Sequence, residues 1–154
     1  MPQFETKRHV KHAPDKMFAL VADIEKYPEF LPLCTGLTVR SRRERDGRTL
    51  LVADMSVGYK AIRETFTTQV FLKPDEHVIE VKYIDGPFRY LQNSWRFEAA
   101  ADGGSNVQFF IDYEFKSRIL GALMGTMFDR AFRMFADAFE KRADLIYGKP
   151  GVTA

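Results

Sequence analysis

The sequence has a single cysteine, Cys34, among its 154 residues. One thiol excludes an internal disulfide bond and any metal site built from several cysteines, and it is typical of a reducing compartment. The 23 lysine and arginine residues nearly balance the 21 aspartate and glutamate residues, which leaves a net charge of +2. So small a net charge does not produce the strong positive electrostatic field typical of nucleic-acid-binding proteins, and we expect no DNA partner.

Long apolar runs are also absent. No uncharged stretch is long enough to cross a bilayer, and the opening "MPQFETKRHVKH" lacks the apolar core of a secretory signal. We therefore expect a cytoplasmic protein in which any contact with a membrane is peripheral.

Signatures of catalysis and of metal binding are missing as well. The sequence contains no G-x-S-x-G, H-E-x-x-H, G-x-G-x-x-G or P-loop motif, and Cys34 has no assignable histidine base. His9 and His12 form an H-x-x-H pair, but this spacing on a strand places them on opposite faces and no third ligand is near. We expect no catalytic residues, no metal site and no enzymatic activity.

The order of secondary-structure signals predicts an α+β fold. Phe4 to Val10 predicts a strand, and Ala13-Pro14-Asp15 predicts the start of a helix. Pro28 and Pro32 limit the next segment to a short helical turn and a loop. Turn signals such as Asp46-Gly47 then separate alternating segments, which is typical of an antiparallel sheet. We expect these strands at residues 38–45, 48–57, 60–72, 77–84, 88–99 and 105–116.

The segment from Ser117 to Tyr147 predicts one helix of about 45 Å, because apolar residues recur in it at steps of three and four. We predict one domain over residues 1–148, in which a curved antiparallel sheet wraps around this helix and two short helices follow the first strand. Residues 149–154 are expected to form a disordered tail. The predicted apolar stripe of the long helix comprises Leu120, Leu123, Met124, Met127, Phe128, Ala131, Phe132, Phe135, Ala138, Phe139 and Ile146.

Three stretches resemble the coenzyme Q-binding protein family of the START-like helix-grip superfamily: "VADIEKYPEFLPLC" at 21–34, "GPFRYLQNSWRF" at 86–97, and the terminal helix. The resemblance runs from about Phe4 to Tyr147. It implies a START-like, polyketide cyclase and lipid-transport type of domain with an internal hydrophobic cavity. It further implies a carrier or chaperone that binds ubiquinone, or a similar isoprenoid lipid, in support of respiratory electron transport. Such a carrier would associate peripherally with the inner membrane of a bacterium, or with its matrix side if the protein is mitochondrial. Ubiquinone would be a bound ligand, and the resemblance implies no redox cofactor.

The apolar stretch "YPEFLPLC", residues 27–34, is interpreted as a lid that closes over the ligand and meets the membrane; the alternative is a loop that caps the core. Asn93 and Trp95 share a strand face, so their amide and indole N–H could bond a quinone carbonyl, or Trp95 could be an ordinary core residue. Met124 and Met127 suit a flexible lipid tail, or ordinary core packing. The candidate ligand-binding residues are Tyr27, Phe30, Leu31, Leu33, Phe88, Leu91, Asn93, Trp95, Leu123, Met124, Met127, Phe128 and Phe132.

An arginine cluster surrounds the Asp46-Gly47 turn, and it leaves a second function open. It could contact anionic headgroups or ribosomal RNA, or it could be the charged exposed strand edge that sheets commonly have. The family that the chain resembles also includes ribosome-association toxins, so the alternative is a protein that binds the large ribosomal subunit and blocks subunit joining. A polyketide cyclase-like enzyme is the third alternative. The cluster consists of Arg40, Arg42, Arg43, Arg45 and Arg48.

Overall fold

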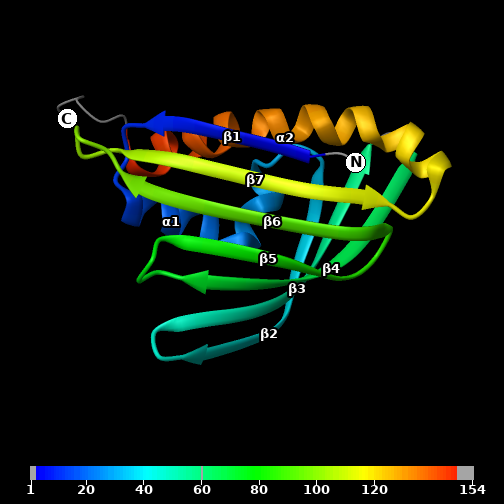
Figure 1. The fold of residues 1–154 in the computed structure, drawn as a ribbon, viewed down its shortest axis with the longest axis horizontal. Coiled ribbons are helices and arrows are strands. Elements are labelled where there is room, and N and C mark those ends of the chain that lie inside the picture. Colours follow the sequence, from blue (N-terminus) through cyan, green and yellow to red (C-terminus); the bar gives the residue numbers. More distant parts are fainter. Residues whose placement is uncertain (1–2, 60, 149–154) are drawn as a thin grey trace.

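The computed structural model describes residues 3–59 and 61–148 (Figure 1). The predicted tail at 149–154 lies outside the described residues. The elements, in chain order, are β1 (Gln3–Val10), α1 (Pro14–Ala22), the 3-10 helix η1 (Ile24–Glu29), β2 (Cys34–Arg45), β3 (Arg48–Tyr59), β4 (Ile62–Lys73), β5 (Val78–Asp85), β6 (Phe88–Ala99), β7 (Ser105–Phe115) and α2 (Arg118–Tyr147).

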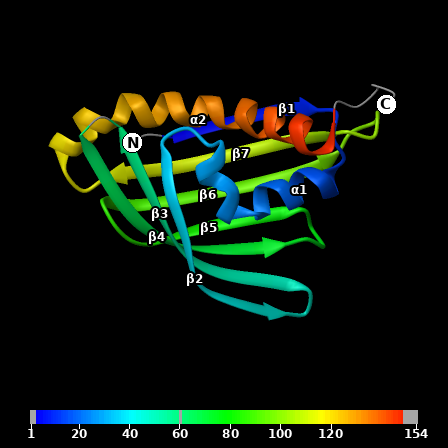
Figure 2. The same cartoon turned by 180° about the vertical axis from the view of Figure 1, so that it is seen from behind.

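The strands form one antiparallel sheet in the order β1-β7-β6-β5-β4-β3-β2. The sheet curves, and α2 runs along the side formed by β1 and β7, while the β2–β3 hairpin projects at the far edge (Figure 1). From behind, α1 lies across the concave face beside α2 (Figure 2). This arrangement confirms the predicted helix-grip architecture. The largest difference in a strand boundary is at β2, which begins at Cys34, four residues before the expected start.

Local chemistry explains where the elements begin. Pro14 occupies the first turn of α1 and Asp15 follows it, where a carboxylate favours the positive end of the helix. Ser117 caps α2 by accepting a hydrogen bond from the backbone N–H of Leu120 at 3.2 Å. The alternate residues of β7 are buried from Ser105 to Phe115, as its period-two pattern predicts.

The buried face of α2 is narrower than the predicted stripe. Leu123 is 57% exposed and Ile146 is 51% exposed, so the prediction that both belong to the covered stripe was wrong. Leu123 lies on a flank of α2 that no strand covers, because the helix packs against β7, β1 and α1. Ile146 lies in the last turn. The residues of α2 that are buried are Met124, Phe128, Ala131, Phe132, Phe139 and Ala143.

The turn between β5 and β6 requires glycine at position 86. Gly86 has a φ of 144°, and a Cβ atom added there would lie 2.5 Å from Cβ and 2.9 Å from Cα of Phe66. Both values are far below ordinary contact distances, and one of them involves backbone. The turn therefore allows β4 and the β5–β6 connection to approach each other only in the absence of a side chain.

We predict that Gly86→Ala lowers the free energy of unfolding by about 3 kcal/mol, because it adds overpacking to backbone strain. Gly47→Ala is the matched control, since Gly47 also has a positive φ, of 80°, but within the described residues no atom other than those of its chain neighbours lies within 4 Å of its added Cβ. This control should cost only about 1 kcal/mol. Chemical denaturation of both variants measures the difference, and equal losses would contradict the steric account.

Candidate functional site

An apolar cavity of about 100 Å³ lies between the concave face of the sheet, η1 and α2. Its wall draws on every element of the described chain except β1 and α1. Almost all of its lining side chains are hydrophobic. They are Ile24, Tyr27, Leu31, Leu37, Met55, Phe66, Val70, Ile79, Val81, Leu91, Asn93, Trp95, Phe109, Ile111, Phe135 and Phe139.

Strand register builds the floor of this cavity in rows. Val70 pairs with Val81, Val81 with Asn93, and Asn93 with Ile111, so these four side chains share one face across β4 to β7. The adjacent row joins Ile79, Trp95 and Phe109 in the same way. Because directly paired residues of antiparallel strands point to the same face, the register alone brings both rows to the concave side.

The roof of the cavity consists of η1, the loop after it, and α2. Tyr27 packs edge-to-face on Phe139 with ring centroids 5.4 Å apart, and Trp95 meets the same ring at 5.1 Å. An ion pair of 2.7 Å between Arg142 and Glu29 holds α2 against η1 outside these rings. The guanidinium of Arg142 also lies 5.1 Å from the ring of Phe30.

Few polar atoms reach the cavity wall. The amide Nδ2 of Asn93 donates a hydrogen bond of 2.8 Å to the backbone oxygen of Phe110. The hydroxyl of Tyr27 donates to the backbone oxygen of Val21, and burial raises the pKa of this phenol above its ordinary value. The site can therefore bind an apolar molecule and orient it through a small number of hydrogen bonds.

Five of the thirteen candidate ligand-binding residues line the cavity. They are Tyr27, Leu31, Leu91, Asn93 and Trp95. Most of the remaining wall was not predicted from the sequence, although the inward positions of the strands were readable from their alternation. The missing information was the register that selects which inward residues meet, as in the row from Val70 to Ile111.

The other eight candidates lie elsewhere. Phe88 is fully buried in an aromatic cluster with Phe66, Phe115 and the candidate Phe128, so it does not line the cavity. Phe30 packs on Phe139 from outside. Four others lie on α2, where Met124 and Phe132 are buried, Met127 is half-buried and Leu123 is exposed. The last, Leu33, follows η1 and has a φ of 68°.

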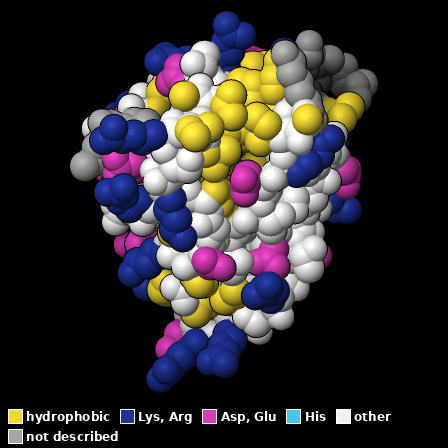
Figure 3. Space-filling view, turned by 90° about the vertical axis from the view of Figure 1, so that its right-hand side faces the viewer, with side chains coloured by type: hydrophobic (Ala, Val, Ile, Leu, Met, Phe, Trp, Pro, Cys, Tyr) yellow, Lys and Arg dark blue, Asp and Glu magenta, His cyan; other side chains and the backbone are white. Residues whose placement is uncertain are grey.

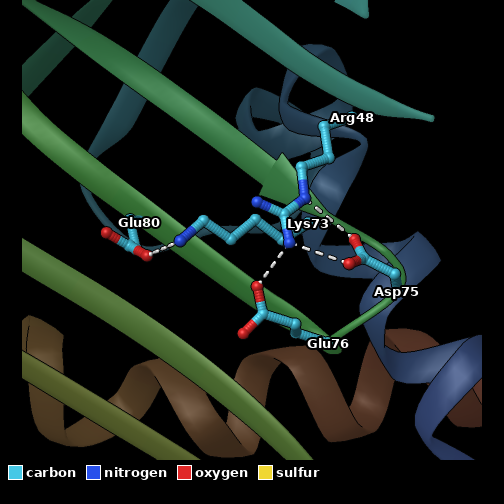
Figure 4. Close-up of polar contacts among 5 residues, drawn as sticks. All are labelled: Arg48, Lys73, Asp75, Glu76 and Glu80. Atoms are coloured by element: carbon cyan, nitrogen blue, oxygen red, sulfur yellow. Dashed lines mark hydrogen bonds and ion pairs between the residues drawn. The ribbon is translucent and has the colours of Figure 1, made fainter. Parts of the chain in front are cut away.

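The arginine cluster is largely neutralised within the chain. Arg40 pairs with Asp54 at 2.7 Å, and Arg48 pairs with Asp75 at 2.8 Å and with Glu76 at 2.7 Å. Figure 4 shows Arg48 reaching the turn between β4 and β5, with Lys73 paired to Glu80 beside it. The hydrogen bond from Arg48 lowers the pKa of Asp75.

The rest of the cluster follows the same pattern with longer contacts. Arg42 lies 3.8 Å from Glu44, and Arg45 lies 3.8 Å from Asp46. Within residues 3–59 and 61–148, Arg43 is the member of the cluster without an ion pair. The cluster therefore presents much less unpaired positive charge than its five arginines suggest.

The histidines and the cysteine have structural partners. His9 pairs with Asp102, and the buried His12 lies 2.7 Å from Asp144. The part of the chain that is described contains no group of three side chains able to hold a metal ion. Burial raises the pKa of the Cys34 thiol to about 11, so this thiol is protonated at neutral pH and is a poor nucleophile.

A hydrophobic patch marks the end of the molecule at which α2 begins (Figure 3). Ile119 is 74% exposed there, and Leu123 lies on the same flank of the helix one turn later. By helical periodicity the exposed Arg130 and Met134 continue this flank.

Among the described residues, no helix combines the length and the hydrophobicity needed to span a membrane.

Comparisons with known proteins agree with this geometry. The chain is similar to the ribosome association toxin RatA of Vibrio cholerae, with 32% identity over 97% of this chain and 100% of the relative. It is also 29% identical to the mitochondrial coenzyme Q-binding protein COQ10 of Dictyostelium discoideum, over 94% of this chain and 70% of the relative. The solution structure of an 18 kDa protein from Caulobacter crescentus superposes with a TM-score of 0.80 at 34% identity, covering 96% of this chain and 99% of that one.

One family model matches residues 10–140, and its description is polyketide cyclase / dehydrase and lipid transport. The match includes the whole cavity wall, from Ile24 to Phe139. The START-like resemblance drawn from the sequence is confirmed, and the chain belongs to the polyketide cyclase / dehydrase and lipid transport family.

Proposed function

We propose that this protein binds an isoprenoid lipid with a ring-shaped head, most simply ubiquinone, and carries it in support of respiratory electron transport. The observation that carries the proposal is the apolar cavity between the sheet, η1 and α2, whose wall includes only a few hydrogen-bonding groups. The similarity to a coenzyme Q-binding protein supports the same ligand class. In this proposal the lipid is cargo, and the protein neither converts it nor uses it as a cofactor.

The size of the cavity indicates that binding requires a change of shape. At about 100 Å³ it is smaller than the roughly 300–1,000 Å³ typical of ligand pockets. A ring with a long tail needs more room, and the roof is the part that can provide it. The ion pair between Arg142 and Glu29 is partly exposed and hence weak, so it offers little resistance to separation of η1 from α2.

The membrane surface is the proposed place of loading and delivery. The flank of α2 that carries Ile119, Leu123, Arg130 and Met134 combines exposed apolar and basic side chains, which suits an anionic lipid interface. In this proposal the start of α2 enters the headgroup region while the lid segment, residues 27–34, opens. The family description includes cyclases and dehydrases as well as lipid transport, so lipid binding has to be measured separately from any conversion of the lipid.

Ribosome binding is the second candidate, because relatives that cover the chain almost fully are named ribosome association toxins. Arg43, which has no ion pair within the described chain, would be its most available phosphate contact. Against this candidate, the other arginines of the cluster are paired with carboxylates.

We predict that Val81→Phe reduces the lipid retained by the protein at least tenfold, because the added ring fills the cavity. Val52→Phe is the matched control, since Val52 pairs with Gln69 on the opposite face of the sheet. Each protein is incubated with vesicles containing ubiquinone, and the bound lipid is extracted and measured by mass spectrometry. Circular dichroism checks that both variants fold, and equal lipid retention by the two would contradict the cavity assignment.

Leu123→Asp should weaken binding to anionic vesicles about tenfold, because it places a carboxylate on the apolar and basic flank of α2. Ala122→Asp adds the same charge one residue earlier, on a different side of the helix, and should change binding little. Vesicle co-sedimentation measures both. The extracted lipid content of pre-loaded protein should stay at the wild-type level in both variants, since Leu123 does not line the cavity.

The carrier proposal predicts that the protein remains in the supernatant when large ribosomal subunits are sedimented at physiological salt, and that its expression does not arrest growth. Co-sedimentation that Arg43→Glu abolishes and Arg48→Glu preserves would instead establish the ribosomal function. The contrast is informative because Arg48 is held by Asp75 and Glu76, whereas Arg43 is not held in this way.

A further inference from the structure

Two residues of β6 bring polar atoms to the otherwise apolar cavity wall. Asn93 and Trp95 are two positions apart, so they lie on the same face of the strand, roughly 6.6 Å from each other along it. Trp95 is the chain's one tryptophan and is 4% exposed. The donors and acceptors of these side chains that have no partner predict which polar groups a ligand in the cavity must carry.

Trp95 contributes a donor. Its indole N–H has no acceptor among the described residues, although buried indoles usually have one. In the same residues, Arg142 Nε is the sole side-chain nitrogen or oxygen that is both fully buried and without a partner. The indole N–H must therefore border open space. Trp95 lines both the cavity and the groove on the outer side of β5 and β6, but its ring packs on Phe109 and Phe139 at the concave face, so we assign this N–H to the cavity.

Asn93 contributes an acceptor. The backbone oxygen of Phe110 can only accept, so the amide atom bonded to it is the nitrogen, which fixes the orientation of the side chain. No donor from the described chain reaches the Oδ1 atom of this amide. The side chain is half-buried at the cavity wall, and a ligand that covers Oδ1 must supply a hydrogen to it.

Tyr27 contributes a second acceptor from the roof. Its hydroxyl hydrogen is donated to the backbone oxygen of Val21, so the hydroxyl oxygen can only accept any further hydrogen bond. Its aromatic ring contacts Phe139 above the cavity. The wall and roof together offer two unused donors, the Trp95 N–H and the second amide hydrogen of Asn93, and two unused acceptors, Asn93 Oδ1 and the Tyr27 oxygen.

We propose that the cavity selects the reduced, quinol form of its lipid over the quinone. This inference rests on the proposed function. A quinone carbonyl can only accept, so it can use the Trp95 N–H, or the second hydrogen of the Asn93 amide, but it leaves both acceptors bare. A hydroxyl both donates and accepts, so a quinol satisfies groups that the quinone cannot. The carrier would then take its load from reactions that reduce quinones and deliver it to reactions that oxidise quinols.

Isothermal titration calorimetry under anaerobic conditions tests this selection, with a ubiquinone bearing two isoprene units as the probe. The quinone, its quinol, and the dimethyl ether of the quinol are titrated separately into the wild-type protein. We expect the quinol to bind about tenfold tighter than the quinone, the usual size of one net hydrogen bond to a buried group. This preference corresponds to a rise of about 30 mV in the reduction potential of the bound probe.

The dimethyl ether has the shape of the quinol but no hydrogen to donate, so it should bind no better than the quinone. Asn93→Leu should remove most of the preference for the quinol, because it deletes the Oδ1 acceptor that the quinol can use and the quinone cannot. Asn106→Leu is the matched control, because Asn106 lies on β7 outside the cavity, and it should keep the full preference. The ether comparison needs no variant, so it tests the inference even if a substitution prevents folding.

The outcomes separate this inference from the proposed function. Equal binding of quinone and quinol, tighter binding of the quinone, or an ether that matches the quinol would overturn the selection and leave the carrier proposal in place. Binding of none of the three probes would overturn both.

Discussion

The concave face of the sheet presents more apolar surface than one helix can cover, and most other features follow from this constraint. α2 packs along β7 and β1, and α1 covers part of β5 and β6. Between these two covers the floor rows from Val70 to Ile111 and from Ile79 to Phe109 would face water. The segment from η1 to Leu31 closes this gap, and the cavity is the volume that its side chains leave unfilled.

The closing segment is held by contacts of two kinds. Rings meet edge-to-face where Tyr27 and Phe30 contact Phe139, and this burial resists opening in water. Outside them, Arg142 bonds Glu29, while its buried Nε lacks a partner in the described structure. An apolar ligand or an apolar surface would replace the ring contacts. The roof is therefore stable in water and easier to displace next to lipid, which is what the proposed carrier function would require.

Much of the fold was predictable because it depends on local patterns. The alternation of β7, the Pro14 start of α1 and the turn at Asp46-Gly47 each determine their element from neighbouring residues. The width of the covered face of α2 was not predictable in this way. Helical periodicity groups Leu123 with Met124 and Met127, but whether a strand lies opposite Leu123 depends on how far the sheet curves around the helix.

The site was predictable only in part, for a related reason. Period-two counting placed Leu91, Asn93 and Trp95 on one face, and the structure places all three at the cavity. Val81 and Ile111 lie beside them because of the strand register, and Phe135 lies there because of the position of α2. Neither the register nor the helix position can be predicted from a local sequence pattern. Phe88 looked equally suitable from the sequence, but a shift of register between Phe88 and Tyr90 separates it from that pattern, and its ring packs in the aromatic cluster with Phe66.

The arginine-rich strand β2 has a consequence that does not depend on any partner. β2 is the last strand of the sheet, so within the described part of the chain one row of its backbone N–H and C=O groups has no neighbouring strand. Such an edge is a template for strand addition by another chain, and closely spaced charges oppose that addition because they would have to be desolvated against the incoming strand. Arg40, Arg42, Arg43 and Arg45, with Glu44 among them, give β2 this protection over the projecting half of the hairpin. The charged side chains of the cluster therefore disfavour edge-to-edge aggregation of the sheet through β2.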